Sequence, residues 1–89
     1  MADIRLERKL KTLDWLNTVK SKYEEEIKKG EDEVTEFKRK TFDSEEDSYR
    51  LKHMEECVDE TRRAKASIEQ SILQANRELK ALQDELSNQ

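Results

Sequence analysis

Apolar side chains in the first half of the chain recur at steps of three and four residues. They are Leu6, Leu10, Leu13, Leu16, Val19, Tyr23, Ile27, Val34 and Phe37, with Gly30 filling a gap in the series. This spacing is that of one face of an α-helix and predicts a helix over about residues 3–41. Because Gly30 falls on the apolar face, we expect the opposite helix to approach closely there.

The second half of the chain repeats the pattern with a more regular period. Its series is Leu51, Met54, Val58, Thr61, Ala64, Ile68, Ile72, Ala75, Leu79, Leu82 and Leu86, which is ten steps in thirty-five residues. The mean step is therefore about 3.5 residues, the heptad period of a left-handed coiled coil. We predict a second helix over about residues 48–87.

The stretch TFDSEEDS, residues 41–48, interrupts both series and predicts a turn at about 42–47. It offers Asp43, Ser44, Asp47 and Ser48 as residues that can cap the second helix. A link this short folds the helices back on each other, so facing positions should sum to about 89. Leu10 then faces Leu79, and Leu13 faces Ala75. The predicted fold is an all-α, antiparallel two-helix coiled-coil hairpin forming one domain over residues 1–89.

One level of this hairpin is wider than a two-helix seam requires. Trp15 and Leu16 lie opposite Ile72 and Leu73, so adjacent apolar residues fall on neighbouring faces of each helix. Burying one large apolar side chain contributes roughly 1.5–3 kcal/mol, so these four residues should be covered by something else. We consider two covers: a second copy of the hairpin, giving a four-helix bundle, or a client protein.

Composition agrees with a long, solvated helical hairpin. Charged residues make up 45% of the 89 residues and hydrophobic ones 33%, with no proline and one glycine. That balance is too polar for a sheet sandwich or an α/β enzyme. The net charge is −4, and residues 41–89 carry twelve acidic against seven basic residues. Without a basic face, we expect no nucleic-acid partner.

Other functional classes lack their usual signals. The opening MADIRLERKL has charges where a signal peptide needs an apolar run, and no segment is apolar enough to span a membrane. The single cysteine, Cys57, cannot form an internal disulfide, so we expect an intracellular location. Since catalysis needs a concave pocket with converging polar groups, we predict that the protein is not an enzyme and has no cofactor.

A metal site deserves separate consideration because His53 and Cys57 are four residues apart on one helical face, near Glu56 and Glu60. Two such pairs from two chains would supply four zinc ligands. Structural zinc sites normally show clearer ligand sets, so we predict no metal, a solvated His53 and a Cys57 that flanks the seam.

The stretch DSYRLKHMEECVDETRR, residues 47–63, resembles the start of the second helix in the tubulin-binding cofactor A family of β-tubulin chaperones. The family pattern is approximately Asp-Pro-Tyr-Asp-Leu-Lys-Lys-Gln-Glu-Glu-Val-Leu-Asp-Glu-Ser/Thr-Arg/Lys. This chain keeps Asp47, Tyr49, Leu51, Lys52, Glu55, Glu56, Asp59, Glu60, Thr61 and Arg62. KLKT, residues 9–12, and YEEEI, residues 23–27, are similar to two further family motifs. Ser48, Arg50 and the pair His53-Met54 depart from the pattern.

The resemblance implies a cytoplasmic, cytoskeleton-associated cofactor that binds and holds β-tubulin during folding and heterodimer assembly. The client-binding residues would be Tyr49, Lys52, Glu55, Glu56, Asp59 and Glu60. Family members commonly continue into a short third helix, so the resemblance implies a cofactor A-like hairpin with that helix short or absent. The alternative function is a structural coiled-coil homodimerisation module with no folding client.

Overall fold

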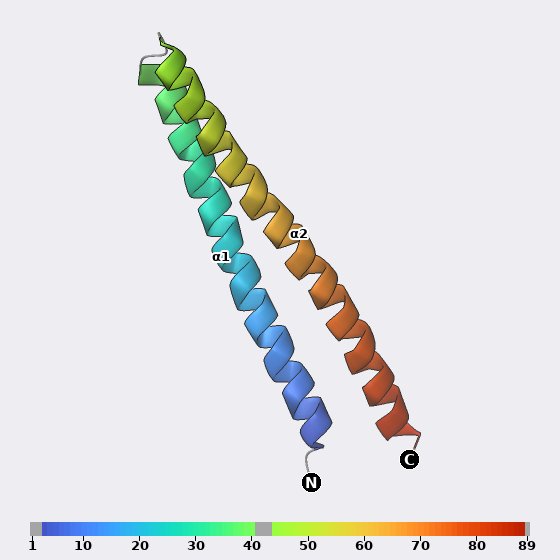
Figure 1. The fold of residues 1–89 in the computed structure, drawn as a ribbon. Helices are drawn as coiled ribbons and strands as arrows, with labels where there is room; N and C mark the ends of the chain where they lie inside the picture. Colours follow the sequence, from blue (N-terminus) through green and yellow to red (C-terminus); the bar gives the residue numbers. More distant parts are fainter. Residues whose placement is uncertain (1–2, 41–43, 89) are drawn as a thin grey trace. The chain divides into compact units, whose positions relative to one another are not determined.

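The chain forms two long α-helices in the computed structural model, which describes residues 3–40 and 44–88. Helix α1 comprises Ile4–Lys40 and helix α2 comprises Glu45–Ser87 (Figure 1). The described residues contain no β-strand. The predicted all-α class and the two predicted helices are therefore confirmed.

Helix α2 begins three residues earlier than the predicted start at about 48. Ser44 is its N-cap: the Ser44 Oγ accepts a hydrogen bond from the Asp47 backbone N–H at 3.1 Å, and the Ser48 N–H donates to the Ser44 carbonyl oxygen at 3.1 Å. The first turn contains Glu45, Glu46 and Asp47, which favour the positive end of the helix dipole. The predicted start was too late because this first turn has no apolar residue, and the prediction relied on the spacing of apolar residues. Among the proposed caps, Asp43 lies outside the described residues.

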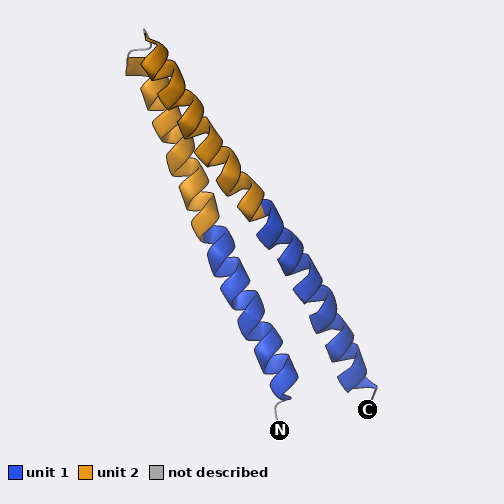
Figure 2. Cartoon of the chain, in the orientation of Figure 1, with its two compact units in different colours: residues 1–21, 66–89 blue, residues 22–65 orange. Residues whose placement is uncertain are grey.

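Each helix contributes to two compact units (Figure 2). Unit 1 pairs Met1–Ser21 with Ala66–Gln89, and unit 2 consists of Lys22–Lys65. In unit 1, Lys9 contacts Glu78 and the Arg5 Nη1 lies 3.4 Å from the Glu85 Oε2. In unit 2, Arg62 contacts Glu31 and Lys38 contacts Glu55. Early residues therefore meet late residues within each unit, so both pairs are antiparallel, as predicted.

The core of unit 1 is a narrow apolar seam between its two helical segments. Leu13, Leu16 and Ala75 are buried, and the partly buried side chains of Ile68, Ile72 and Leu79 pack against them. Leu13 and Ala75 thus meet in the seam as the register predicted. Each large side chain buried in this way contributes roughly 1.5–3 kcal/mol to stability.

One seam position in unit 1 differs from the prediction. Leu10 was expected to face Leu79, but its side chain is 49% exposed, whereas Lys9 is half-buried. Residues 6, 9, 13 and 16 alternate steps of three and four, which keeps them on one side of the helix. Lys9 fits there because its aliphatic stem covers the seam while its ammonium group reaches Glu78.

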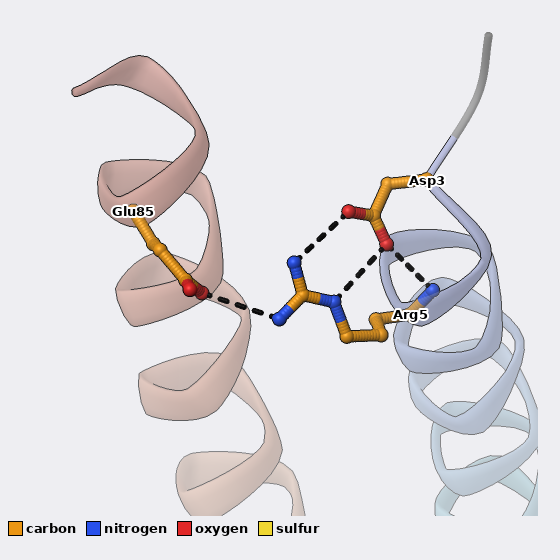
Figure 3. A network of polar contacts seen from close by, with 3 residues as sticks. All are labelled: Asp3, Arg5 and Glu85. Atoms are coloured by element: carbon orange, nitrogen blue, oxygen red, sulfur yellow. Dashed lines mark hydrogen bonds and ion pairs between the residues drawn. The ribbon is translucent and has the colours of Figure 1, made fainter. Parts of the chain in front are cut away.

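The end of unit 1 is joined by a polar network of Asp3, Arg5 and Glu85 (Figure 3). Asp3 caps α1, since its Oδ1 accepts a hydrogen bond from the Arg5 backbone N–H at 2.8 Å. The Arg5 guanidinium also contacts Asp3 and reaches across to Glu85 on α2. The side-chain hydrogen bond from Arg5, followed by that backbone hydrogen bond, lowers the pKa of Asp3.

Unit 2 has a thinner seam, in which Val58 is buried among half-buried neighbours. Gly30 allows a close approach of the two helices there: a Cβ atom at residue 30 would lie 2.6 Å from the Val58 Cγ2. The expected close approach at Gly30 is therefore confirmed. The glycine costs about 1 kcal/mol of helix propensity relative to alanine, but no larger residue fits without movement of Val58.

Candidate protein-binding surface

The six predicted client-binding residues, which are among the ten that match the cofactor A pattern, lie on the exposed surface of α2 in unit 2. Tyr49, Lys52, Glu55, Glu56, Asp59 and Glu60 are all exposed. None of them is a seam residue: Lys52, Glu55 and Glu56 lie between Leu51, Met54 and Val58 in the sequence, and Tyr49, Asp59 and Glu60 lie just outside that range. The side chain of Tyr49 is 74% exposed, which leaves an aromatic ring on the surface without burial in the chain's own core.

Two of these residues, Glu55 and Asp59, line a shallow groove between the helical segments of unit 2. The groove has a volume of about 480 Å³ and is also lined by Glu31, Val34, Thr35, Lys38, Val58 and Arg62. The lining thus combines the buried Val58 with three acidic and two basic side chains. The sequence pattern placed Glu55 and Asp59 on a binding face, and the structure adds the α1 residues that share it.

Ion pairs fix the charges along this groove. The Arg62 Nη2 lies 2.5 Å from the Glu31 Oε1, and the Arg62 Nη1 lies 3.1 Å from the Asp59 Oδ1. The Lys38 Nζ lies 3.6 Å from the Glu55 Oε1. The hydrogen bond with Glu31, with support from Asp59, raises the pKa of Arg62 above its ordinary value. Arg62 therefore holds two carboxylates in a defined arrangement.

The other candidate residues are not part of that groove. Lys52, Glu56 and Glu60 have no ion-pair partner within the described chain, so their charges are available to a partner. Tyr49 borders a separate apolar hollow of unit 2 lined by Phe37, Arg50, His53 and Met54. The six residues thus share the exposed side of one helix without converging on a single pocket, an arrangement suited to contact with a broad protein surface.

His53 and Cys57 lie together on one exposed face of α2. The Cys57 Sγ is 3.8 Å from the His53 Nε2, and both side chains are exposed. Both line a small groove with Glu26, Gly30 and Glu33. Among residues 3–40 and 44–88, no group of three or more His, Cys, Asp or Glu side chains is placed to hold a metal ion. Whether two copies of the chain assemble such a site stays untested.

The four apolar interface candidates divide into two pairs in unit 1. Leu16 is only 6% exposed, and Ile72 packs against the same core, so both serve the internal seam. Trp15 is 61% exposed and Leu73 is 50% exposed. Two helices therefore leave part of this apolar level uncovered, as expected, but only Trp15 and Leu73 remain free to contact another molecule.

Sequence reasoning did not identify Glu31 and Lys38 as part of the candidate surface. Both lie on α1, outside the stretch that carries the resemblance, yet they pair with Arg62 and Glu55 on α2. The two ion pairs could have been predicted from the antiparallel register, because it brings oppositely charged residues of the two helices close together along the seam.

Comparison of the chain with known protein families, with curated proteins and with solved structures found no match. Within the described residues, neither helix has an apolar stretch long enough to cross a membrane.

Proposed function

We propose that this protein is a cytoplasmic tubulin-folding cofactor that binds and holds β-tubulin during folding and tubulin heterodimer assembly. The observation that carries the proposal is the placement of Tyr49, Lys52, Glu55, Glu56, Asp59 and Glu60. They are six of the ten residues that the chain shares with the cofactor A pattern, and all six are exposed on α2 rather than used in the seam.

The proposed mechanism is capture of a protein surface, with no chemical step. Unit 2 has a net charge of −4, so its exposed carboxylates attract basic segments of a client and orient the encounter. The unpaired Glu56 and Glu60 would form the first polar contacts, while the exposed ring of Tyr49 contributes apolar area. The groove with its fixed ion pairs would then select the register of the bound segment.

The test is a binding measurement with purified β-tubulin. We expect the double variant Glu56→Lys/Glu60→Lys to bind at least about tenfold more weakly, because two carboxylates without an intramolecular partner are reversed. The matched control is Glu25→Lys/Asp32→Lys, which changes the net charge by the same amount on the outer side of α1 in the same unit. Equal loss of binding in both variants would indicate a non-specific charge effect. Unchanged binding in both would remove this face of α2 from the mechanism.

A structural role in joining two copies of the chain is the second candidate function. The observation that favours it is the exposure of Trp15 and Leu73 in unit 1, away from the residues of the tubulin proposal. Sedimentation equilibrium of the purified chain tests it directly. A mass of one chain at all accessible concentrations would exclude this role and would leave tubulin binding unaffected.

A further inference from the structure

The stretch DSEED, residues 43–47, has an acidic residue at each of the three positions that follow Ser44. Ser44 is the only serine or threonine of the sequence with this context. The client-binding residues proposed above begin at Tyr49, so the proposed function gives this stretch no role.

A run of carboxylates after a serine is the pattern that acid-directed protein kinases recognise. The substrate cleft of such a kinase presents basic side chains to the positions that follow the acceptor hydroxyl, so charge complementarity selects the serine. One, two and three residues after Ser44, these positions are filled by Glu45, Glu46 and Asp47. The sequence therefore supplies a carboxylate to the cleft at each of the three positions.

The Ser44 side chain is accessible to a kinase. Ser44 is exposed and directly precedes Glu45, the first residue of α2. In the first turn, Glu45, Glu46 and Ser48 are exposed and Asp47 is half-buried. Since protein kinases bind their substrates in an extended conformation, this turn must unwind on the enzyme. Unwinding breaks the cap and one turn of backbone hydrogen bonds, but it takes no apolar side chain of the turn out of the seam.

Ser21 shows why the position in the fold matters as well as the nearby charge. It is also exposed, and the acidic run at residues 24–26 follows it. Ser21 lies inside α1, however, and is followed by the half-buried Tyr23. Extending the backbone from Ser21 to this acidic run would break the middle of a long helix and remove Tyr23 from the seam. Ser44 avoids this cost because it lies at a helix start.

We propose that Ser44 is phosphorylated by an acid-directed protein kinase. The Ser44 Oγ attacks the γ-phosphorus of Mg²⁺-bound ATP, so that an Oγ–P bond forms while the bond from this phosphorus to the β,γ-bridging oxygen breaks. ADP leaves, and the hydroxyl proton passes to the catalytic aspartate of the kinase. The inference is independent of tubulin binding.

The phosphate then serves as the N-cap of α2. In the unmodified chain, the Ser44 Oγ accepts a hydrogen bond from the Asp47 backbone N–H at 3.1 Å. Phosphorylation adds acceptor oxygens beside the first N–H groups of the helix, which have no carbonyl partner within it. It also adds negative charge at the positive end of the helix dipole. Glu45 and Glu46 repel this charge, but both are exposed and screened by salt. We therefore expect α2 to stay helical from Glu45 onward.

The first experiment treats the purified full chain with casein kinase II, an acid-directed kinase, in the presence of Mg²⁺ and ATP. Mass spectrometry should find one added phosphoryl group per chain and locate it on Ser44. Ser44→Ala should abolish the addition, whereas Ser21→Ala should leave its rate unchanged. Glu45→Gln/Asp47→Asn keeps the hydroxyl group and removes two carboxylates, so the kcat/KM of the kinase for this variant should fall more than about tenfold.

The matched control is Glu25→Gln/Asp32→Asn, which removes the same charge from the outer side of α1 in unit 2. It should be phosphorylated at the wild-type rate. An equal loss of rate in the two double variants would assign the effect to overall charge and overturn the proposed recognition. A chain that accepts no phosphate, or accepts it on another residue, would overturn the assignment of Ser44.

Nuclear magnetic resonance tests the role of the phosphate as the cap. In the phosphorylated chain, the chemical shift of the Asp47 amide proton should follow the second ionisation of the phosphate, at about pH 6. In the unmodified chain the same proton should show no step at this pH. A phosphorylated chain whose Asp47 amide does not respond, or whose helicity by circular dichroism falls, would overturn the capping role and leave Ser44 as the phosphorylation site.

Discussion

Unit 1 has fourteen charged residues among its 45, with no net charge, whereas unit 2 has 26 among 44 and a net charge of −4. Both units are pairs of antiparallel helical segments that use the same heptad spacing, so the fold does not require this difference. Leu13, Leu16 and Ala75 give unit 1 a three-residue buried cluster, while Val58 is the buried residue in the described part of unit 2. Unit 1 thus holds more of the buried core, and unit 2 carries the denser array of charges.

The contrast extends to the exposed apolar side chains. Ile4, Leu10, Trp15 and Leu73 of unit 1 are exposed, and Tyr49 is their counterpart in unit 2. An apolar surface on a neutral unit favours contact with another copy, while exposed charges on an acidic unit favour orientation of a different partner. The two proposed roles therefore use different surfaces, and variants in one unit should not affect the function of the other.

The largest expected effect comes from the core of unit 1. Leu16→Ala should lower the free energy of unfolding by about 2–4 kcal/mol, since it leaves a cavity beside Leu13 and Ala75. The neighbouring Trp15→Ala should cost under about 1 kcal/mol in the monomer, because most of the indole is already in solvent. Urea unfolding followed by circular dichroism at low protein concentration measures both. Similar losses of unfolding free energy in the two variants would contradict the assignment of Leu16 to the seam and Trp15 to the surface.

A smaller effect is expected at the close approach in unit 2. Gly30→Ala should destabilise the wild-type chain. The added Cβ atom would lie 2.6 Å from the Val58 Cγ2, and the cost of this steric clash exceeds the gain in helix propensity. In a Val58→Ala background the obstructing methyl group is absent, so the same Gly30→Ala change should stabilise by about 1 kcal/mol. Thermal unfolding of the four chains gives the sign in each background. Stabilisation by Gly30→Ala in both would show that glycine is not needed for packing here.

The smallest effect concerns pH. Hydrogen bonds from Lys9 and then from Gln74 lower the pKa of Glu78 below its ordinary value. A lowered carboxyl pKa contributes stability at pH values above the ordinary pKa of about 4.3, and the contribution is lost as the pH falls through the lower, folded-state value. Glu78→Gln should therefore be slightly less stable than wild type at pH 7 and equally stable near pH 2. Because these groups are exposed, the difference should also shrink in 1 M salt.

The control for this pH effect is Glu25→Gln, a carboxylate of unit 2 on the outer side of α1. We expect its stability relative to wild type to change little with pH. An equal pH dependence for both variants would assign the effect to overall charge rather than to the Lys9–Glu78 contact.

The amino-acid sequence was sufficient to predict the helical class, the antiparallel pairing and most seam residues, because a heptad pattern directly encodes which side of a helix is buried. It failed where two neighbouring residues compete for one position. Leu10 is more apolar than Lys9, yet Lys9 occupies the seam because its ammonium group pairs with Glu78 on the other helix. The spacing of apolar residues within one helix gives no information about an ion pair with the other helix, such as that between Lys9 and Glu78.

The candidate surfaces were predictable only in part for the same reason. The resemblance identified exposed residues on α2, but Glu31 and Lys38 join them through pairing across the seam. Likewise, Trp15 and Leu16 were treated together because both are large and apolar, although one residue of helical rotation buries Leu16 and exposes Trp15. Burial depends on the angle around the helix, which hydrophobicity alone does not give.

Hydrogen–deuterium exchange of the full chain, with and without purified β-tubulin, tests most directly the claim that unit 2 captures the client. Backbone amides of residues 45–65 should exchange more slowly in the presence of β-tubulin, while those of residues 66–87 should keep their rates. Protection confined to residues 66–87, or no protection anywhere at saturating β-tubulin, would contradict the proposed division between the two units.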